Sequence, residues 1–166
     1  AARIAAAAGI PVVLTSAERA RDLAKKPVHV LGYGERTTNT SMTAVAALTV
    51  SGAAGAAQDA LARAGLGIGD IDVFEVYDSF TITVALTLEA LGLCGPGEAL
   101  DLIADGNIRP GGGLALNTSG GGLSYCHPGQ YGVLLLVEAV RQLRGEAGDR
   151  QVPGARHALA HGTGGI

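Results

Sequence analysis

Predicted strands, which are short apolar segments, alternate along this chain with predicted helices. The predicted strands cover residues 10–15, 28–33, 71–76, 114–116 and 156–161. The predicted helices cover residues 17–24, 51–64, 79–91, 98–105 and 128–144. Alternation of this kind favours a mainly parallel sheet with helices packed on both of its faces. The sequence therefore predicts an α/β fold, in about one domain for a chain of 166 residues.

The expected helix boundaries are marked by residue types that favour helix ends. Ser16, and either Asp78 or Ser79, can accept hydrogen bonds from the amides of a first helical turn. Pro128 suits a first turn as well. Glycines at positions 65, 92 and 145 can end the helical runs that precede them. Residues 36–49 show weak periodicity, and we predict a loop there.

The composition argues against several classes of protein. Hydrophobic residues make up 48% of the chain and charged residues only 16%, which excludes a disordered protein. A net charge of -3 argues against nucleic-acid binding, which needs a basic face. Cys94 and Cys126 form no CxxC pair, so we expect neither a disulfide framework nor a metal site. No run reaches the ~18 apolar residues of a membrane span, and the start lacks a signal-peptide pattern, so we expect a cytoplasmic protein.

Three polar segments follow predicted strands and are candidates for chemistry. Their residues are 77–80 (YDSF), 124–128 (SYCHP) and 161–165 (HGTGG). Open α/β sheets gather ligand sites at the carboxyl ends of their strands. Such an edge suits an acyl group whose carbonyl becomes an enolate or oxyanion, because donors already arranged around that oxygen lower the barrier.

His127 is the central candidate. An imidazole beside Pro128 at a helix start can donate a hydrogen bond to a carbonyl oxygen and stabilise negative charge on it. The preceding Gly120, Gly121 and Gly122 would let the backbone approach a ligand closely. The structural alternative is that His127 caps the helix and the glycines turn the chain. The spacing is not that of a phosphate-binding loop.

Other polar residues of these segments have both a chemical and a structural interpretation. Tyr77 and Tyr125 can transfer a proton or bind a carbonyl, because a phenol both donates and accepts, or they can be amphipathic fillers. His161 is either a general base or a structural residue at a strand end. Cys126 is either a thiolate nucleophile or a small buried side chain. Ser79 is no hydrolase nucleophile, because it does not lie in a GxSxG elbow.

Together the three segments resemble the thiolase superfamily. Asn117-Thr118-Ser119-Gly120-Gly121-Gly122 followed by Cys126-His127-Pro128 is similar to the thiolase pattern Asn-x-x-Gly-Gly, then Gly-His-Pro. Residues 77–80 stand in the place of Asn-Glu-Ala-Phe, or of His-Asp-Cys-Phe in the sterol carrier protein X thiolases. Residues 161–165 stand in the place of Cys-x-Gly. Residues 14–20 (LTSAERA) and 77–93 also look like the lipid-transfer-protein branch.

This resemblance implies a fold and a set of site residues. The implied fold is the C-terminal half of a five-layer αβαβα arrangement, so we expect residues 1–166 to be a thiolase C-terminal-like domain without its N-terminal half and last strand. His127 matches the histidine that helps to form an oxyanion hole, and Asn117 matches the asparagine of the glycine-rich segment. The catalytic candidates are Tyr77, Tyr125, His127 and His161. The substrate-binding candidates are Asn117, Gly120, Gly121 and Ser79.

The sequence departs from the thiolase pattern where thiolases carry their thiol base. His161 replaces the cysteine of Cys-x-Gly, and Ser79 replaces the cysteine of His-Asp-Cys-Phe. Cys126 replaces the glycine before His-Pro, a position that is not the base in the family. Tyr77 and Tyr125 instead resemble the paired tyrosines of thiolase-like aldolases that shorten steroid side chains. Those enzymes cleave a β-hydroxyacyl-CoA by retro-aldol chemistry without a covalent cysteine, and they work with a small partner bearing an OB-fold.

From this resemblance we expect an enzyme that makes or breaks a carbon–carbon bond in acyl-CoA thioesters. Retro-aldol cleavage is favoured slightly over thiolytic acyl transfer. The alternative is a non-catalytic subunit that binds acyl-CoA or lipid on a thiolase scaffold. We expect a homodimer, an OB-fold partner protein, and no cofactor apart from the coenzyme A of the substrate.

Overall fold

A computed structural model describes residues 2–5, 11–38 and 51–163, together with residues 41, 43, 47 and 49 between the last two ranges. Its centre is a short parallel sheet, formed by β3 (Val73–Val76) and β4 (Ala158–His161) with Val76 opposite His161. On the other edge of β3, Phe74 forms a parallel bridge with Leu116. The prediction of a parallel sheet is confirmed, although the expected strand at 114–116 is reduced to this single bridge.

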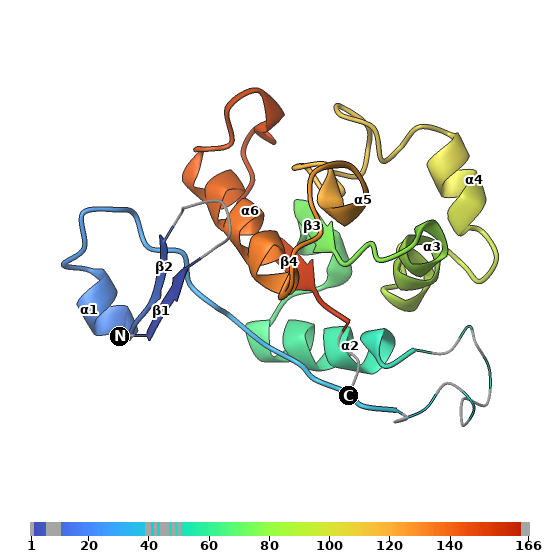
Figure 1. Cartoon of the computed structure of the whole chain (residues 1–166), viewed down its shortest axis with the longest axis horizontal. Coiled ribbons are helices and arrows are strands. Elements are labelled where there is room, and N and C mark those ends of the chain that lie inside the picture. The colour runs from blue at the N-terminus through green and yellow to red at the C-terminus, as the bar shows by residue number, and fades with distance from the viewer. Residues whose placement is uncertain are drawn as a thin grey trace.

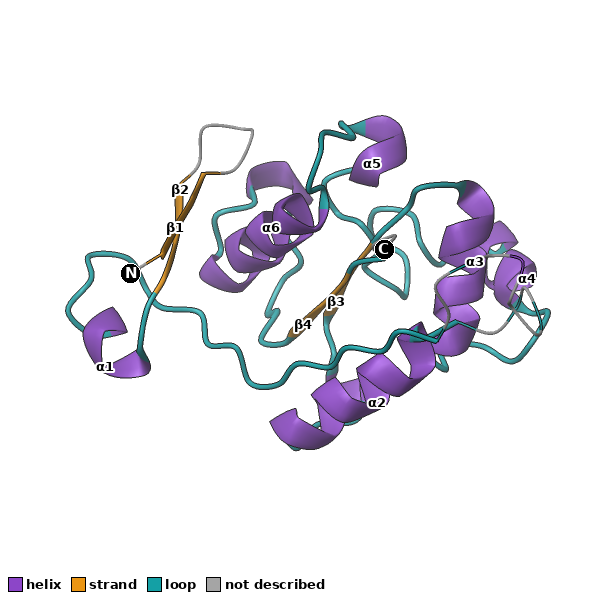
Figure 2. Ribbon diagram, turned by 60° about the horizontal axis from the view of Figure 1, so that its bottom comes forward, coloured by secondary structure: helices purple, strands orange, loops and turns teal. Residues whose placement is uncertain are grey.

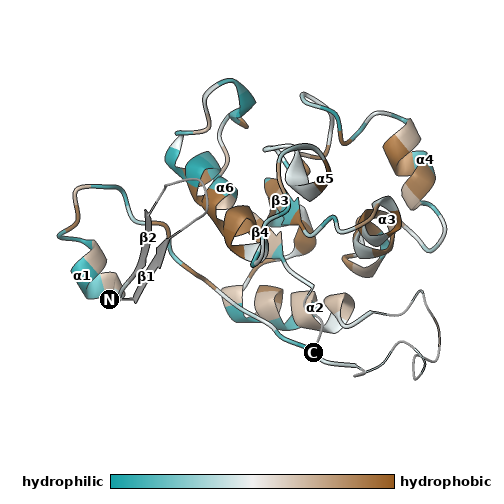
Figure 3. Ribbon diagram, in the orientation of Figure 1, coloured by the Kyte–Doolittle hydropathy of each residue, from teal (hydrophilic) through white to brown (hydrophobic). Residues whose placement is uncertain are grey.

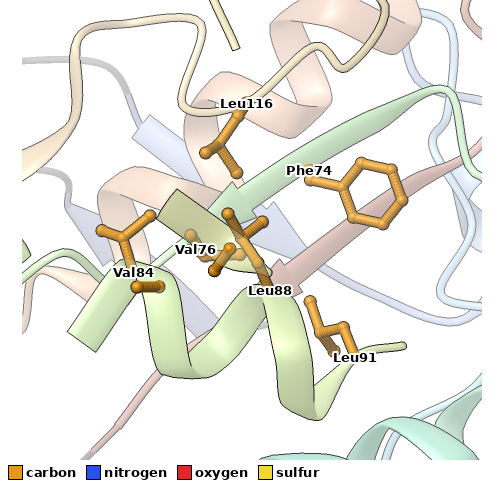
Figure 4. Close-up of a cluster of buried hydrophobic side chains, with 8 residues drawn as sticks. Phe74, Val76, Val84, Leu88, Leu91 and Leu116 are labelled. Carbon is orange, nitrogen blue, oxygen red and sulfur yellow. The ribbon is translucent and has the colours of Figure 1, made fainter. Parts of the chain in front are cut away.

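Helices cover both faces of the sheet. Side chains alternate along β3, so successive residues of this strand contact helices on opposite faces. Phe74 and Val76 pack against α3 (Thr81–Ala90) in a cluster that includes Leu88 (Figure 4). Tyr77 packs against the cluster of α6 (Gly132–Arg144), and Glu75 contacts residues on that same face. Figure 1 shows β3 and β4 lying between α6 and α3. The predicted α/β architecture is therefore confirmed.

The remaining elements surround this body. They are β1 (Ala2–Ala5), β2 (Pro11–Leu14), α1 (Ala17–Ala20), α2 (Ala53–Ala64), η2 (Ile68–Asp70), α4 (Ala99–Ala104), α5 (Gly121–Ser124) and η3 (Gly148–Arg150). Strands β1 and β2 pair antiparallel, and Figure 2 shows this hairpin and α1 standing beside the α/β body. No helix in the described ranges is both long enough and apolar enough to cross a bilayer.

Several predicted helix boundaries are confirmed. The Ser16 hydroxyl accepts a hydrogen bond from the Arg19 amide at 3.4 Å. Gly65 and Gly145 follow α2 and α6 with φ of 67° and 74°, and Gly92 takes φ of 77° just beyond α3. These left-handed conformations cost glycine little, which is why it is common where helices end. Helix α1 stops at Ala20, earlier than the predicted residue 24.

Two predictions about the second half of the chain are wrong in detail. The helix expected from Pro128 begins only at Gly132, because Gln130 adopts φ of 60° and so cannot continue a right-handed helix. Residues 117–127, where no helix is predicted, contain the short helix α5. Both differences lie next to the glycine-rich segment, where the chain takes backbone conformations that residue patterns predict poorly.

The strand predicted at 28–33 is also wrong. This segment is not a strand and lies against α2. Gly32, and Gly34 just beyond the segment, contact the main-chain carbonyls of Ala60 and Ala56. Its apolar pattern fits a strand, yet it forms no strand ladder within the described residues. Side chains at Val30 and Leu31 are exposed.

We predict that Gly34→Ala destabilises the folded protein. A β-carbon at Gly34 would overlap the Ala56 carbonyl oxygen, and that oxygen is held within α2. Overpacking of this kind costs about 1–3 kcal/mol in unfolding free energy. The measurement is urea unfolding of the complete protein, with Gly69→Ala as the matched control, because a β-carbon at Gly69 meets no atom within 4 Å. Equal stability of the two variants would contradict the observed contact.

Apolar surface remains on the outer side of α3 and α4. Figure 3 colours both helices largely as hydrophobic. Phe80 at the start of α3, Ile82 on α3 and Leu100 on α4 are exposed by 69%, 60% and 68%. Helices that are apolar around most of their circumference are typical of positions inside a larger assembly.

Candidate active site

The ends of β3 and β4 bring two of the polar segments together. The Tyr77 amide donates a hydrogen bond to the His161 carbonyl at 2.9 Å, so these residues are neighbours across the strand ends. Because Val76 and His161 are in register, the His161 side chain lies on the α3 face of the sheet, whereas Tyr77 lies on the α6 face. The two side chains therefore leave the same edge in different directions.

Tyr77, His127 and Tyr131 form an aromatic cluster at this edge. The Tyr77 hydroxyl lies 2.8 Å from His127 Nε2. Tyr131 stacks on the imidazole with ring centroids 5.5 Å apart, and meets the Tyr77 ring edge-on at the same separation. Tyr131 is buried while His127 is exposed, so the cluster has a fixed base and an accessible end. In this cluster Nε2 of the imidazole faces the phenol hydroxyl of Tyr77.

Asp78 fixes the glycine-rich segment that leads to His127. Its buried carboxylate accepts hydrogen bonds from the Gly122 amide at 2.7 Å and the Leu123 amide at 3.1 Å. These are amides of the first turn of α5, where a negative charge is favourable. The prediction that Asp78 or Ser79 caps the helix after β3 is wrong. Phe80 occupies that N-cap position without a side-chain hydrogen bond, and the Ser79 hydroxyl lies 3.1 Å from the Thr83 hydroxyl.

The glycines allow this close approach to Asp78. Gly120 and Gly121 have φ of 97° and 69°, in the region that favours glycine. A β-carbon at Gly121 would overlap an Asp78 carboxylate oxygen, and one at Gly122 would lie 3.1 Å from His127 Cδ2. We expected the glycines to bring backbone close to a ligand. What they approach in the structure is Asp78 and the His127 ring.

Asn117 connects the same segment to the sheet. Its side-chain oxygen accepts a hydrogen bond from the Val76 amide at 2.7 Å, and the residue adopts a left-handed φ of 46°. The side chain thus takes over a hydrogen bond that a neighbouring strand would otherwise make to β3. A role of Asn117 in substrate binding stays a prediction.

Tyr125 and His161 are not part of the aromatic cluster. Tyr125 is 59% exposed and lines a separate pocket with side chains of α6 and with Arg150. Within the described ranges it has no ring contact with Tyr77 or His127. His161 Nδ1 is buried without a hydrogen-bond partner among the described residues, and burial lowers the pKa of His161. The imidazole of His161 is therefore held in its neutral form.

Sequence reasoning missed Tyr131 and Glu75. Tyr131 lies four residues after His127, within the predicted helix 128–144. This spacing of about one helical turn was the available signal that the two side chains lie close together. Glu75 is a charged residue in the otherwise apolar run that forms β3, and it is completely buried. A carboxyl group in a buried strand needs either a charged or hydrogen-bonding partner or a proton. The presence of Glu75 in an apolar run was therefore the signal that could have identified this residue.

The chain matches known proteins along most of its length. Residues 34–166 match the family model described as "Thiolase C-terminal domain-like". The chain is 39% identical to 17-hydroxy-3-oxo-4-pregnene-20-carboxyl-CoA lyase of Mycobacterium tuberculosis, over 93% of this chain and 41% of that protein. It is 37% identical to acetyl-CoA acetyltransferase of Methanothermobacter thermautotrophicus, over the same shares of the two chains.

Two further relatives belong to the same set. Human sterol carrier protein 2 is 46% identical over 66% of this chain and 20% of its own length. Among solved structures, the Ltp2-ChsH2(DUF35) aldolase superposes with a TM-score of 0.70 and 36% identity, over 80% of this chain and 37% of that chain. The chain thus spans less than half the length of the relatives that it matches. The match to the family model, the identity to these relatives and the shared fold agree, and the chain belongs to the thiolase C-terminal domain-like family.

Proposed function

We propose that the protein carrying this chain cleaves a carbon–carbon bond in a β-hydroxyacyl-CoA by a retro-aldol reaction. The observation that carries the proposal is the 2.8 Å contact between the Tyr77 hydroxyl and His127 Nε2. In this pair the Tyr77 oxygen can accept a proton from the substrate, and the His127 imidazole, once protonated, can stabilise negative charge beside it. The resemblance to thiolases, in which Ser79 and His161 stand in the places of the thiol base, also supports a reaction without a cysteine base.

The proposed reaction uses one proton and no covalent intermediate. The β-hydroxyl proton moves to the Tyr77 oxygen while the Tyr77 proton moves to His127 Nε2. The bond between the α- and β-carbons breaks, so the β-carbon becomes a ketone or aldehyde and its bonding electrons pass to the thioester as an enolate. The imidazolium stabilises the enolate, and its proton returns through Tyr77 to the α-carbon. Acyl-CoA leaves, and both side chains regain their starting protonation.

Support for an acyl-CoA substrate comes from the relatives. One is named as a CoA lyase, one as an acetyl-CoA acetyltransferase and one as an aldolase. The names of the lyase and of the acetyltransferase both refer to a CoA thioester, and we propose that this protein also acts on a CoA thioester. The homodimer and the OB-fold partner are part of the same proposal, and size-exclusion chromatography of the complete protein with light scattering would test the first of these.

We predict that Cys126→Ala leaves turnover of β-hydroxyacyl-CoA by the complete protein largely intact. No acyl-cysteine forms in the proposed reaction, and the Cys126 side chain is exposed, so its loss leaves no cavity. The measurement is steady-state kcat and KM for the variant and the parent protein.

A dead Cys126→Ala enzyme in which Tyr77→Phe remains active would contradict the proposal. Such a result would favour the second candidate function, thiolytic acyl transfer with Cys126 as the nucleophile. The acetyl-CoA acetyltransferase relative is the observation that keeps this candidate in view.

A further inference from the structure

Glu75 lies in the middle of β3 with none of its surface exposed. One of its carboxyl oxygens, Oε1, contacts the Thr118 amide at 3.1 Å and the Thr118 hydroxyl at 2.8 Å. The other, Oε2, is buried and has no hydrogen-bond partner within the described residues. A carboxylate in this position would be expensive, because a buried charge needs full pairing.

A second buried carboxyl group meets the same hydroxyl from α6. Glu138 Oε1 lies 2.9 Å from the Thr118 hydroxyl, and Glu138 Oε2 forms an ion pair with Arg150 at 3.1 Å. The Gln142 side-chain amide donates to the Thr118 hydroxyl oxygen at 2.9 Å. The Thr118 hydroxyl therefore stands between the two acids.

The number of protons in this group decides its chemical state. The contacts from Thr118 to Glu75 and to Glu138 each join two oxygen atoms, so each needs a proton between them. The Thr118 hydroxyl has one proton to give and can accept two hydrogen bonds. One acid must supply the second proton. With that proton on Glu75, Thr118 accepts from Glu75 and Gln142 and donates to Glu138, and all its hydrogen-bonding capacity is used.

The electrostatic environment identifies Glu75 as the protonated acid. Burial raises the pKa of Glu75 to about 7, and the negative charge of Glu138 also raises it. The hydrogen bonds from Thr118 and the positive charge of Arg150 lower this pKa, but by less. Burial also acts to raise the pKa of Glu138, but the hydrogen bonds from Arg150, Thr118 and Gln142 lower it overall.

We propose that Glu75 is a positioning residue that holds a proton in the folded protein at weakly acidic pH and, by donating it to Thr118, fixes the start of the glycine-rich segment that carries His127. Thr118 follows Asn117, whose side chain is bonded to the Val76 amide, and precedes the glycines that Asp78 holds. Loss of the Glu75 proton leaves two anionic acids facing one hydroxyl, which removes one of the anchors of this segment.

The pH dependence follows from the direction of the pKa shift. The pKa of Glu75 is higher in the folded state than its ordinary value of 4.5. The folded state therefore binds the proton more tightly, so the stabilisation is complete well below pH 4.5 and is lost as the pH rises through about 7. Between pH 4.5 and 8 the unfolding constant of the parent protein should rise about 150-fold relative to Glu75→Gln, since each pKa unit is a tenfold change and the group is already half ionised in the unfolded chain at pH 4.5.

Two measurements on the complete protein test the inference. The first is the carboxylic-acid C=O band in the infrared spectrum at pH 6, where ordinary carboxyl groups are ionised. The band should titrate away with a midpoint near the pKa of about 7, persist in Thr118→Ser and be absent in Glu75→Gln. The second is urea unfolding of the parent and Glu75→Gln proteins between pH 4.5 and 8.

An absent band at pH 6, or a constant ratio of the two unfolding constants across this range, would overturn the inference. If Glu75→Gln does not fold, the titration of the band in the parent protein and in Thr118→Ser still decides it. Neither measurement involves substrate, so their outcome is independent of whether the proposed retro-aldol function is right. If both proposals hold, kcat should also fall above about pH 7 in the parent protein, while KM changes little.

Discussion

Tyr77→Phe should lower kcat of the complete protein for a β-hydroxyacyl-CoA about 100- to 10,000-fold, the range in which positioned acid–base groups act. The change removes only the hydroxyl that lies 2.8 Å from His127 Nε2, while the ring contacts with His127 and Tyr131 can persist. KM should change little, because the hydroxyl acts mainly in the transition state. Steady-state kinetics, with circular dichroism to check folding, provide the measurement.

Tyr125→Phe is the informative companion to this variant. The sequence resemblance makes both tyrosines candidates, but the geometry joins only Tyr77 to the imidazole. Full activity of Tyr77→Phe together with a large loss in Tyr125→Phe would show that proton transfer passes through Tyr125. In that case the pocket that Tyr125 lines, and not the aromatic cluster, would be the catalytic site.

His127→Ala should reduce kcat/KM by a factor that corresponds to about 3–4 kcal/mol, as expected when one donor to a developing oxyanion is lost. The variant also removes the proton acceptor for Tyr77. Because the His127 side chain is exposed and Asp78 holds the preceding segment, folding should be little affected. The measurement is kcat/KM beside the midpoint of urea unfolding.

His127→Gln is the matched control for this change. It keeps a side-chain donor but loses the basic nitrogen, so it should recover part of the binding of the oxyanion without restoring proton transfer. An unchanged rate in His127→Ala would remove His127 from the proposed reaction. A lost rate accompanied by lost stability would instead indicate a structural role.

The central fold could be predicted because its signals are local. The apolar runs of β3 and β4, and the glycines after α2, α3 and α6, act through burial and backbone conformation within a few residues. The segment at 28–33 was mispredicted because its apolar pattern does not specify the partner. It packs on α2 through Gly32 and Gly34, and such a contact depends on residues that lie ~20–30 positions away in the sequence.

The site was only partly predictable for the same reason. His127 and Tyr77 stand out because they follow recognisable segments, but nothing local shows that Asp78 caps α5 and not the helix after it. The residue pattern predicts Tyr131 inside a helix, whereas the helix begins at the next residue, Gly132. The linkage of Glu75 to Glu138 through Thr118 brings together three segments, and only the folded chain places these side chains within hydrogen-bonding distance.

The most direct test of the account is the stoichiometry of the reaction of the complete protein with a β-hydroxyacyl-CoA. Retro-aldol cleavage needs no free coenzyme A and yields one acyl-CoA and one ketone or aldehyde for each substrate consumed. Thiolysis consumes one free coenzyme A with a β-ketoacyl-CoA and yields two acyl-CoA molecules. We expect equimolar acyl-CoA and carbonyl product without added coenzyme A, measured by mass spectrometry. Turnover that occurs only with free coenzyme A and a β-ketoacyl-CoA such as acetoacetyl-CoA would contradict it.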